Sequence, residues 1–251
     1  MQVNRLKKLK LYGFNNLTKN LSFSFYKLHY LDPSRQTESY NNYIHNIYSA
    51  EKLTSILKDV CGAIGGSILN IAQQDYEPQG ASVTLMISEE AKPESLVAHL
   101  DKSHICVHTY PDDNIQNNIA IFRADIELST CGIISPLKVI NYLLDLFDAD
   151  VIDLDYRIRG MTRNIKGKKL YIDEDINTIS HVLNKVHQEK YHHENIEILN
   201  RNIFSTKLKR KNVKTTDSIF QQNNNLTTDS EIKHISKALA EEIELLFTSA
   251  S

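Results

Sequence analysis

The 251-residue chain has few cysteines and no long apolar run. Three cysteines (Cys61, Cys106 and Cys131) are too sparse and odd in number for a disulfide framework, so we expect a reducing compartment, the cytoplasm. No stretch approaches the roughly 20 apolar residues of a membrane span. The N-terminal lysines are followed by no apolar run before Asn15, so we expect neither a signal peptide nor membrane contact.

The chain also lacks an excess of charge of either sign. Lysine and arginine number 29 against 31 acidic residues, and the net charge of −2 leaves no basic excess. A nucleic-acid-binding protein needs a concentrated basic surface, so we expect no such partner. There is no internal repeat, and the length suffices for a sizeable core in one or two domains.

Apolar periodicity predicts helices interleaved with half-polar strands. Gly65 is expected to end one helix, and Ser135 followed by proline is expected to cap another. The predicted strands cover 9–28 (with a turn at 15–16), 68–72, 81–88, 121–131 and 151–158; the predicted helices cover 53–64, 137–147 and 176–186. This order predicts an α+β fold, a two-layer αβ sandwich with an antiparallel sheet covered by helices.

The predicted strand at 121–131 alternates between two kinds of side chain. Its apolar positions are expected to pack on helices, with Phe122 as an irregularity, and its polar positions to face solvent or a cleft. The apolar set is Ile121, Ala124, Ile126 and Leu128; the polar set is Arg123, Asp125, Glu127 and Ser129.

The last residues differ in composition and predict a C-terminal extension over 191–251, after a main domain over 1–190. The segments 207–211, which is basic, and 221–225, which is rich in glutamine and asparagine, are expected to form a solvated, flexible connector. A capping box from Thr228 to Glu231 predicts the start of a final helix.

The segment with most chemical information is L-D-K-S-H-I-C-V-H-T-Y-P at 100–111, followed by S-T-C-G at 129–132. It places a histidine five positions after Ser103 and a cysteine 28 positions after it. This combination resembles the S-adenosylmethionine decarboxylases, specifically their longer bacterial form. These enzymes cut their own backbone at a serine and leave a pyruvoyl group as the cofactor.

The resemblance implies a self-processing reaction at Ser103. Its hydroxyl attacks the Lys102 carbonyl, which converts the amide into an ester. Removal of the Ser103 α-proton by a base, matched here by His108, releases Lys102 as a carboxylate. The remaining dehydroalanine hydrolyses to the pyruvoyl group, giving a β chain of 1–102 and an α chain of 103–251.

The resemblance also implies the reaction of the mature enzyme. The pyruvoyl group forms a Schiff base with S-adenosylmethionine and accepts electrons when CO₂ leaves, the role that pyridoxal phosphate has elsewhere. Cys131 matches the proton donor to the substrate carbon. The product, decarboxylated S-adenosylmethionine, supplies spermidine biosynthesis.

Further roles carry over from matching positions. Tyr76, before the turn P-Q-G-A-S, matches the residue that stacks on adenine, and Asp112 matches the residue that holds the ribose hydroxyls. Ser82 matches a serine that assists processing in compact relatives. Lys102, in place of their glutamate, and additional residues at about 89–96 fit the longer bacterial subfamily. That subfamily implies a homo-oligomer of αβ units, a dimer or tetramer, and activation by Mg²⁺ in some members.

Three alternative functions remain open at the level of sequence. The same pyruvoyl chemistry could serve ornithine or arginine, and Tyr76 and Asp112 argue for an adenosine instead. An inactive regulatory relative would not need to retain Ser103, His108 and Cys131 together. Cys131 with His108 could form a cysteine-protease-like pair, but no protease motif surrounds them.

A metal site is a further alternative near the motif. The candidate ligands His99, His104, Cys106 and His108 are of types that suit zinc. Three of them, His104, Cys106 and His108, would share one face of a single strand. Ligands in such a row do not easily surround one ion tetrahedrally, so we expect no metal. Cys106 is then a small buried residue, and Cys61 packs in the core of its helix.

Overall fold

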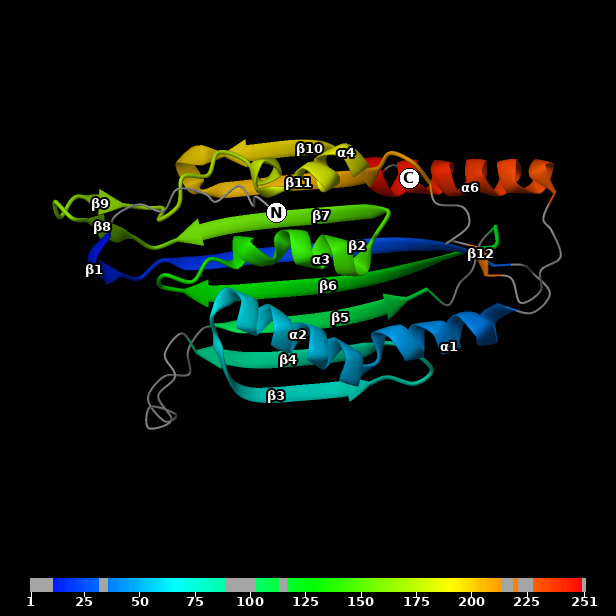
Figure 1. Ribbon diagram of the computed structural model, residues 1–251, viewed down its shortest axis with the longest axis horizontal. Helices are drawn as coiled ribbons and strands as arrows, with labels where there is room; N and C mark the ends of the chain where they lie inside the picture. Colours follow the sequence, from blue (N-terminus) through cyan, green and yellow to red (C-terminus); the bar gives the residue numbers. More distant parts are fainter. Residues whose placement is uncertain are drawn as a thin grey trace.

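The computed structural model describes residues 11–31, 36–88, 103–112, 117–213, 219–220 and 228–249. Lys102, His99 and the segments 89–96 and 221–225 lie outside these ranges. The described part is dominated by a nine-stranded sheet with the order β10-β11-β7-β2-β6-β5-β4-β3, and β12 pairs with β2 (Figure 1).

The long strand β2 lies in the middle of this sheet. All neighbours on the main path are antiparallel, and only the short β12 runs parallel to β2. The strands of the sheet are β2 (Thr18–Leu31), β3 (Ser67–Asp75), β4 (Ala81–Ser88), β5 (His104–Pro111), β6 (Ile119–Cys131), β7 (Val151–Arg159), β10 (Tyr191–Ile198), β11 (Ile203–Arg210) and β12 (Ile219–Phe220). A smaller sheet joins β1 (Leu11–Asn15), β8 (Thr162–Asn164) and β9 (Lys169–Leu170).

Helices cover one face of the main sheet, as the sequence predicts (Figure 1). Gly65 ends α2 with φ of 85°, a left-handed conformation that favours glycine. The helical elements are α1 (Gln36–Tyr48), α2 (Ala50–Ile64), α3 (Ile140–Phe147), α4 (Lys185–Lys190), α6 (Asp229–Thr248) and three 3₁₀ turns, Pro136–Val139, Ile179–Val182 and Leu199–Arg201. Among the described helices, none is long and apolar enough to cross a membrane.

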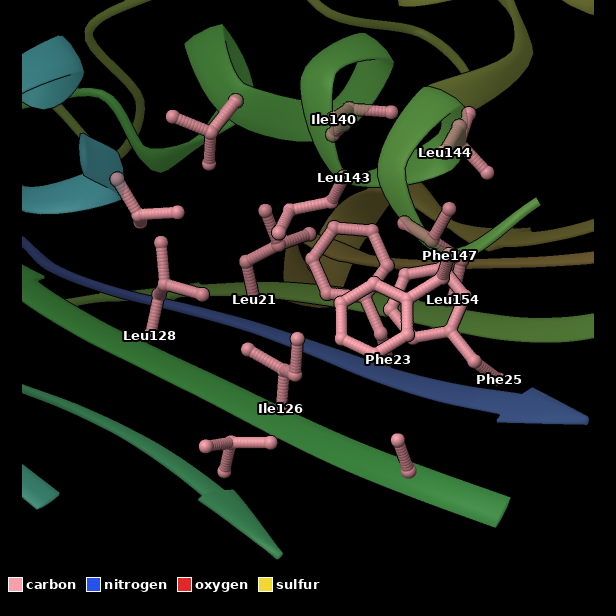
Figure 2. Packing of buried hydrophobic residues seen from close by; sticks show 14 of the residues in the cluster. Leu21, Phe23, Phe25, Ile126, Leu128, Ile140, Leu143, Leu144, Phe147 and Leu154 are labelled. Atoms are coloured by element: carbon pink, nitrogen blue, oxygen red, sulfur yellow. The ribbon is translucent and has the colours of Figure 1, made fainter. Parts of the chain in front are cut away.

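The core between these helices and the sheet is rich in stacked aromatic rings. The Phe25 ring lies between Phe23, with centroids 5.2 Å apart, and Phe147 of α3, at 4.5 Å (Figure 2). Leu143 and Leu154 pack beside them from α3 and β7. Each fully buried apolar side chain of this size stabilises the fold by about 1.5–3 kcal/mol, so this covered face provides much of the stability.

The helix α6 packs on the opposite face, at one end of the sheet. Its buried residues form a second cluster with side chains of β2, β6 and β7; the cluster contains Leu28, Ile119, Val151, Ile235, Leu239, Ile243 and Phe247. The capping box predicted at Thr228 is present, because Thr228 and Glu231 exchange side-chain-to-backbone hydrogen bonds. The rest of this face carries polar side chains, and we call it the open face.

Three local predictions were wrong. Phe122, not Ile121, continues the buried row of β6, and Ile121 packs toward the α6 cluster. Ser135 makes no capping bond; its hydroxyl instead donates to Glu174 (2.6 Å). The segment 176–186 is a 3₁₀ turn followed by the start of α4, because Asn184 caps a new helix there by accepting from the His187 backbone N–H.

The predicted connector was also wrong over most of 207–211. Residues 207–210 belong to β11, which pairs with β10 and β7 within the main sheet. Arg210 is buried there and donates to Asp150 (2.9 Å). The main sheet therefore has strands on both sides of the predicted boundary between 190 and 191.

Candidate active site

The signature segment forms β5, and its alternation is as predicted. Ile105 and Val107 are fully buried on the covered face. His104, Cys106 and His108 are half-buried on the open face. The strand therefore separates a packing row from a row of side chains with chemical function.

Ser103 lies directly before β5 and is only 1% exposed. Its hydroxyl oxygen is buried and has no hydrogen-bond partner among the residues that the structure describes. Its carbonyl accepts from the Ile87 N–H (3.2 Å), which fixes the backbone against β4. The hydroxyl is thus held in place by its backbone while its lone pairs remain available for attack on a neighbouring carbonyl.

Cys131 lies at the same end of the β5–β6 hairpin as Ser103. The first residue pair of the hairpin is His104 with Ser129, so Ser103 and Cys131 flank it on adjacent strands. Cys131 is a free, half-buried thiol at the last position of β6. The backbone after it is tied to β2, since Gly132 N–H donates to the Leu17 carbonyl (3.1 Å).

The other predicted residues gather at the opposite end of β5. Ser82 of β4 is directly opposite His108. The Ser82 hydroxyl is 2.8 Å from the Tyr76 hydroxyl, and Tyr76 is 43% exposed. Asp112 follows β5 at this end, where its N–H donates to the Ile121 carbonyl (3.0 Å). Tyr76, Ser82, His108 and Asp112 are therefore at one end of the open face.

Thr109 joins two motifs that are distant in the sequence. Its hydroxyl accepts from the Ala81 N–H (2.7 Å) and donates to the Ala81 carbonyl (3.2 Å). Gly80, before it, has φ of 103°, and a side chain there would also meet the Thr109 carbonyl at 3.2 Å. Sequence reasoning assigned no role to Thr109, although its place within H-T-Y-P was visible.

The predicted catalytic residues consequently form two groups within one chain. Ser103 and His108 are separated by five positions of extended strand, roughly 16 Å at about 3.3 Å per residue. Their side chains also have opposite parity along β5. The structure brings Ser103 near Cys131, and it brings His108 near Ser82 and Tyr76, but it does not bring Ser103 to His108.

A buried polar cluster lies on the covered face beside the Thr130 end of β6, and sequence reasoning missed it. The Lys19 ammonium is wholly buried and donates to Asp173 (2.6 Å). Lys19 of β2 is directly opposite Thr130 of β6, the neighbour of Cys131. Burial, reinforced by Asp173 and Glu174, raises the pKa of Tyr156 well above its ordinary value. The one sequence signal for this cluster was that Lys19 has the same strand parity as the buried apolar residues of β2.

Three side chains on the open face could hold a metal ion. Donor atoms of His104, Cys106 and Glu127 all lie within 4.8 Å of one another. Burial and the Glu127 carboxylate raise the pKa of the Cys106 thiol. Mg²⁺ prefers six oxygen ligands, and only Glu127 supplies oxygen here, so this cluster does not suit Mg²⁺.

Comparisons with known proteins agree with the motif. A family model described as S-adenosylmethionine decarboxylase matches residues 37–160. Two relatives from Escherichia coli strains 536 and SMS-3-5, both named S-adenosylmethionine decarboxylase proenzyme, are 45% identical over 256 residues, covering 96% of this chain and 97% of each relative. The crystal structure of the adenosylmethionine decarboxylase from Aquifex aeolicus VF5 has 14% identity and a TM-score of 0.37, over 66% of this chain and 100% of that chain. By its identity with the E. coli proteins, the chain belongs to the S-adenosylmethionine decarboxylase family.

Proposed function

We propose that this protein is a self-processing, pyruvoyl-dependent decarboxylase that converts S-adenosylmethionine to its decarboxylated form and CO₂, for spermidine biosynthesis. The observation that carries the proposal is the arrangement of two side chains at the end of the β5–β6 hairpin. There a buried serine hydroxyl without a partner among the described residues lies on the strand next to a free thiol. The names of the E. coli relatives support the substrate and the proenzyme state.

Ser103 is the proposed processing nucleophile. Its hydroxyl attacks the Lys102 carbonyl, the N–C bond is replaced by an ester, and loss of the Ser103 α-proton releases the Lys102 carboxylate. Water then replaces the nitrogen of the dehydroalanine and ammonia leaves, so the α chain begins with a pyruvoyl group. That group supplies the electron sink for decarboxylation.

Cys131 is the proposed proton donor to the substrate carbon. It is half-buried at the end of β6, beside the position of the pyruvoyl group. A positioned thiol can act as a general acid and donate a proton to the substrate carbon after CO₂ leaves. Tyr76 and Asp112 are the proposed contacts for adenine and ribose, and the 43% exposure of Tyr76 supports stacking.

The separation of the two groups of residues supports a homo-oligomer. His108 cannot reach Ser103 of its own straight strand, whereas a second copy seated on the open face can bring its His108 toward this Ser103. We therefore propose that αβ units associate as a dimer or a tetramer, with residues of two copies at each site. Three free thiols support a cytoplasmic location. Activation by Mg²⁺ stays a prediction from the resemblance.

Intact mass under denaturing conditions tests the processing step. We expect two chains, 1–102 and 103–251, with the larger one lighter by one ammonia than the product of hydrolysis. The Ser103→Ala variant should remain a single chain of 28.8 kDa. A wild-type chain that stays intact on incubation, or cleavage of Ser103→Ala at the same bond, would contradict the proposal.

Release of CO₂ from candidate substrates tests the specificity. The processed protein should act on S-adenosylmethionine and leave ornithine and arginine unchanged. Preference for either amino acid would keep the pyruvoyl chemistry and overturn the assignment of Tyr76 and Asp112. A processed protein that decarboxylates none of the three compounds would support the alternative of an inactive regulatory relative.

A further inference from the structure

We propose that the open face contains a binding site for one transition-metal ion of the zinc class, formed by His104, Cys106 and Glu127. The site goes beyond the proposed decarboxylase activity and is independent of it. It departs from the sequence-based expectation of no metal, which considered ligands on a single strand.

The pairing of β5 with β6 creates the site. Cys106 is directly opposite Glu127, and His104 precedes Cys106 by two positions on the same face. Cross-strand neighbours have Cβ atoms about 4.5–5.5 Å apart, which allows their side chains to reach a common point. The second strand thus supplies the ligand that one strand could not place.

The distances suit a metal ion of this class. One donor atom from each of the three residues lies within 4.8 Å of the others. Zinc binds imidazole, thiolate and carboxylate at about 2.0–2.3 Å, which puts the ligands of one tetrahedral ion about 3.5 Å apart. A movement of about 1 Å in flexible side chains therefore closes the site, without a change in the backbone register.

The types of donor set the kind of ion. A nitrogen, a sulfur and an oxygen ligand are the mixture that zinc and its transition-metal neighbours accept, whereas Mg²⁺ and Ca²⁺ require oxygen. Glu127 is exposed while His104 and Cys106 are half-buried. Three protein ligands leave a fourth coordination position, which water or a group of a second copy on the open face can fill.

The next polar residues along the strands are engaged in other contacts. Asp125 lies 3.3 Å from the Arg123 guanidinium, and Arg123 lies over the Tyr110 ring at 4.3 Å. The three ligands thus form a cluster distinct from this charged row. All three belong to residues 103–251, so cleavage before Ser103 leaves the site entirely on the α chain.

Metal titration of the purified, metal-stripped full-length protein tests the site. We expect one Zn²⁺ per chain by calorimetry, and a thiolate-to-Co²⁺ charge-transfer band when Co²⁺ replaces it. Cys106→Ser should abolish the band, and Cys106→Ser and Glu127→Gln should each weaken binding at least tenfold. Mutating a group that only orients a metal ligand typically lowers metal affinity 10–100-fold. Removing a ligand itself should lower the affinity by at least as much.

Matched variants separate this cluster from other thiols and carboxylates. Asp125→Asn, two positions from Glu127 on the same face, and Cys61→Ala, in the core, should keep wild-type affinity and the band. Equal affinities for Glu127→Gln and Asp125→Asn, or a band that survives Cys106→Ser, would overturn the proposal. So would the absence of Zn²⁺ binding.

Folding and processing can be followed separately in the same samples. Melting temperatures report whether each variant folds, and if Cys106→Ser does not fold, the exposed Glu127→Gln decides. Intact mass reports whether the chain is cut. A wild-type protein that is cut normally but binds no Zn²⁺ overturns the metal site alone. A wild-type protein that binds Zn²⁺ but stays uncut contradicts the proposed function alone.

Discussion

The two faces of the central strands β2, β6, β5 and β4 differ in almost every physical respect. The covered face carries buried apolar side chains that pack on α1, α2 and α3. The open face carries histidine, thiol, carboxylate and hydroxyl groups that are half-buried or exposed. Because strand side chains alternate, each strand contributes to both faces. Stability and chemistry can therefore be changed independently, one residue apart, and four predictions test that independence.

The largest effect should come from two cysteines on different faces. Cys131→Ala on the open face should still be cut but lose about 10²–10⁴-fold in turnover, the usual contribution of a positioned proton donor. Cys61→Ala, in the covered-face core, should keep turnover. Intact mass and CO₂ release from S-adenosylmethionine measure the two steps. Full activity of Cys131→Ala would remove it as the donor.

The next effect is on folding stability. Phe25→Ala removes a ring stacked between Phe23 and Phe147 and should lower the free energy of unfolding by about 3–5 kcal/mol. Ser24→Ala, the adjacent residue on the open face, should change it by less than about 0.5 kcal/mol. Urea denaturation of both variants gives the comparison. Equal losses would mean that the two faces do not differ in packing.

A buried histidine predicts a pH dependence of stability. Burial, with Lys27 nearby, lowers the pKa of His29 to about 3. The histidine has a pKa of about 6.5 in the unfolded chain, so between pH 6.5 and 3 the unfolded chain binds a proton that the folded chain does not bind. The free energy of unfolding therefore decreases as the pH falls through this range. Between pH 7 and pH 5 this loss is about 2 kcal/mol. Urea denaturation should show it disappear in His29→Phe and persist in His45→Phe, which changes an exposed histidine.

The smallest effect tests the open face near Ser82. Tyr76→Phe removes a hydroxyl 2.8 Å from the Ser82 hydroxyl but keeps the ring. A net hydrogen bond is worth about 0.5–1.5 kcal/mol, so KM should change by less than about tenfold. Tyr76→Ala removes the stacking surface, worth about 1–3 kcal/mol, and should raise KM further. Equal KM values for the two variants would argue against stacking on adenine.

The two faces of the strands could largely be predicted from the sequence, because the alternation of apolar and polar residues and the positions of turn residues depend only on neighbouring residues. The strands at 81–88 and 151–158, the end of α2 at Gly65 and the faces of β5 follow from side-chain period and glycine chemistry. Only the motif predicts Ser103, His108 and Cys131 as site residues.

The remainder depends on which strands become neighbours. Nothing local to Glu127 shows that it lies opposite Cys106, and nothing near Ser135 reveals a carboxylate 39 positions away. The basic run at 207–211 resembles a solvated segment, but Lys207 and Lys209 are half-buried against Phe247 of α6, and Leu208 between them is buried on the other face. Register is a long-range property, and one sequence does not reveal it.

The place of β2 in the sheet determines the outcome of a cut before Ser103. β2 belongs to the first segment, yet it runs between β6 and β7 of the second, and β4 of the first pairs with β5 of the second. With the pairings of β1 with β8 and of β2 with β12, five strand pairings join the two products within the described residues, so neither product could leave without breaking them. The cut protein would behave as one folding unit without any covalent link between its chains, and separating them would require unfolding.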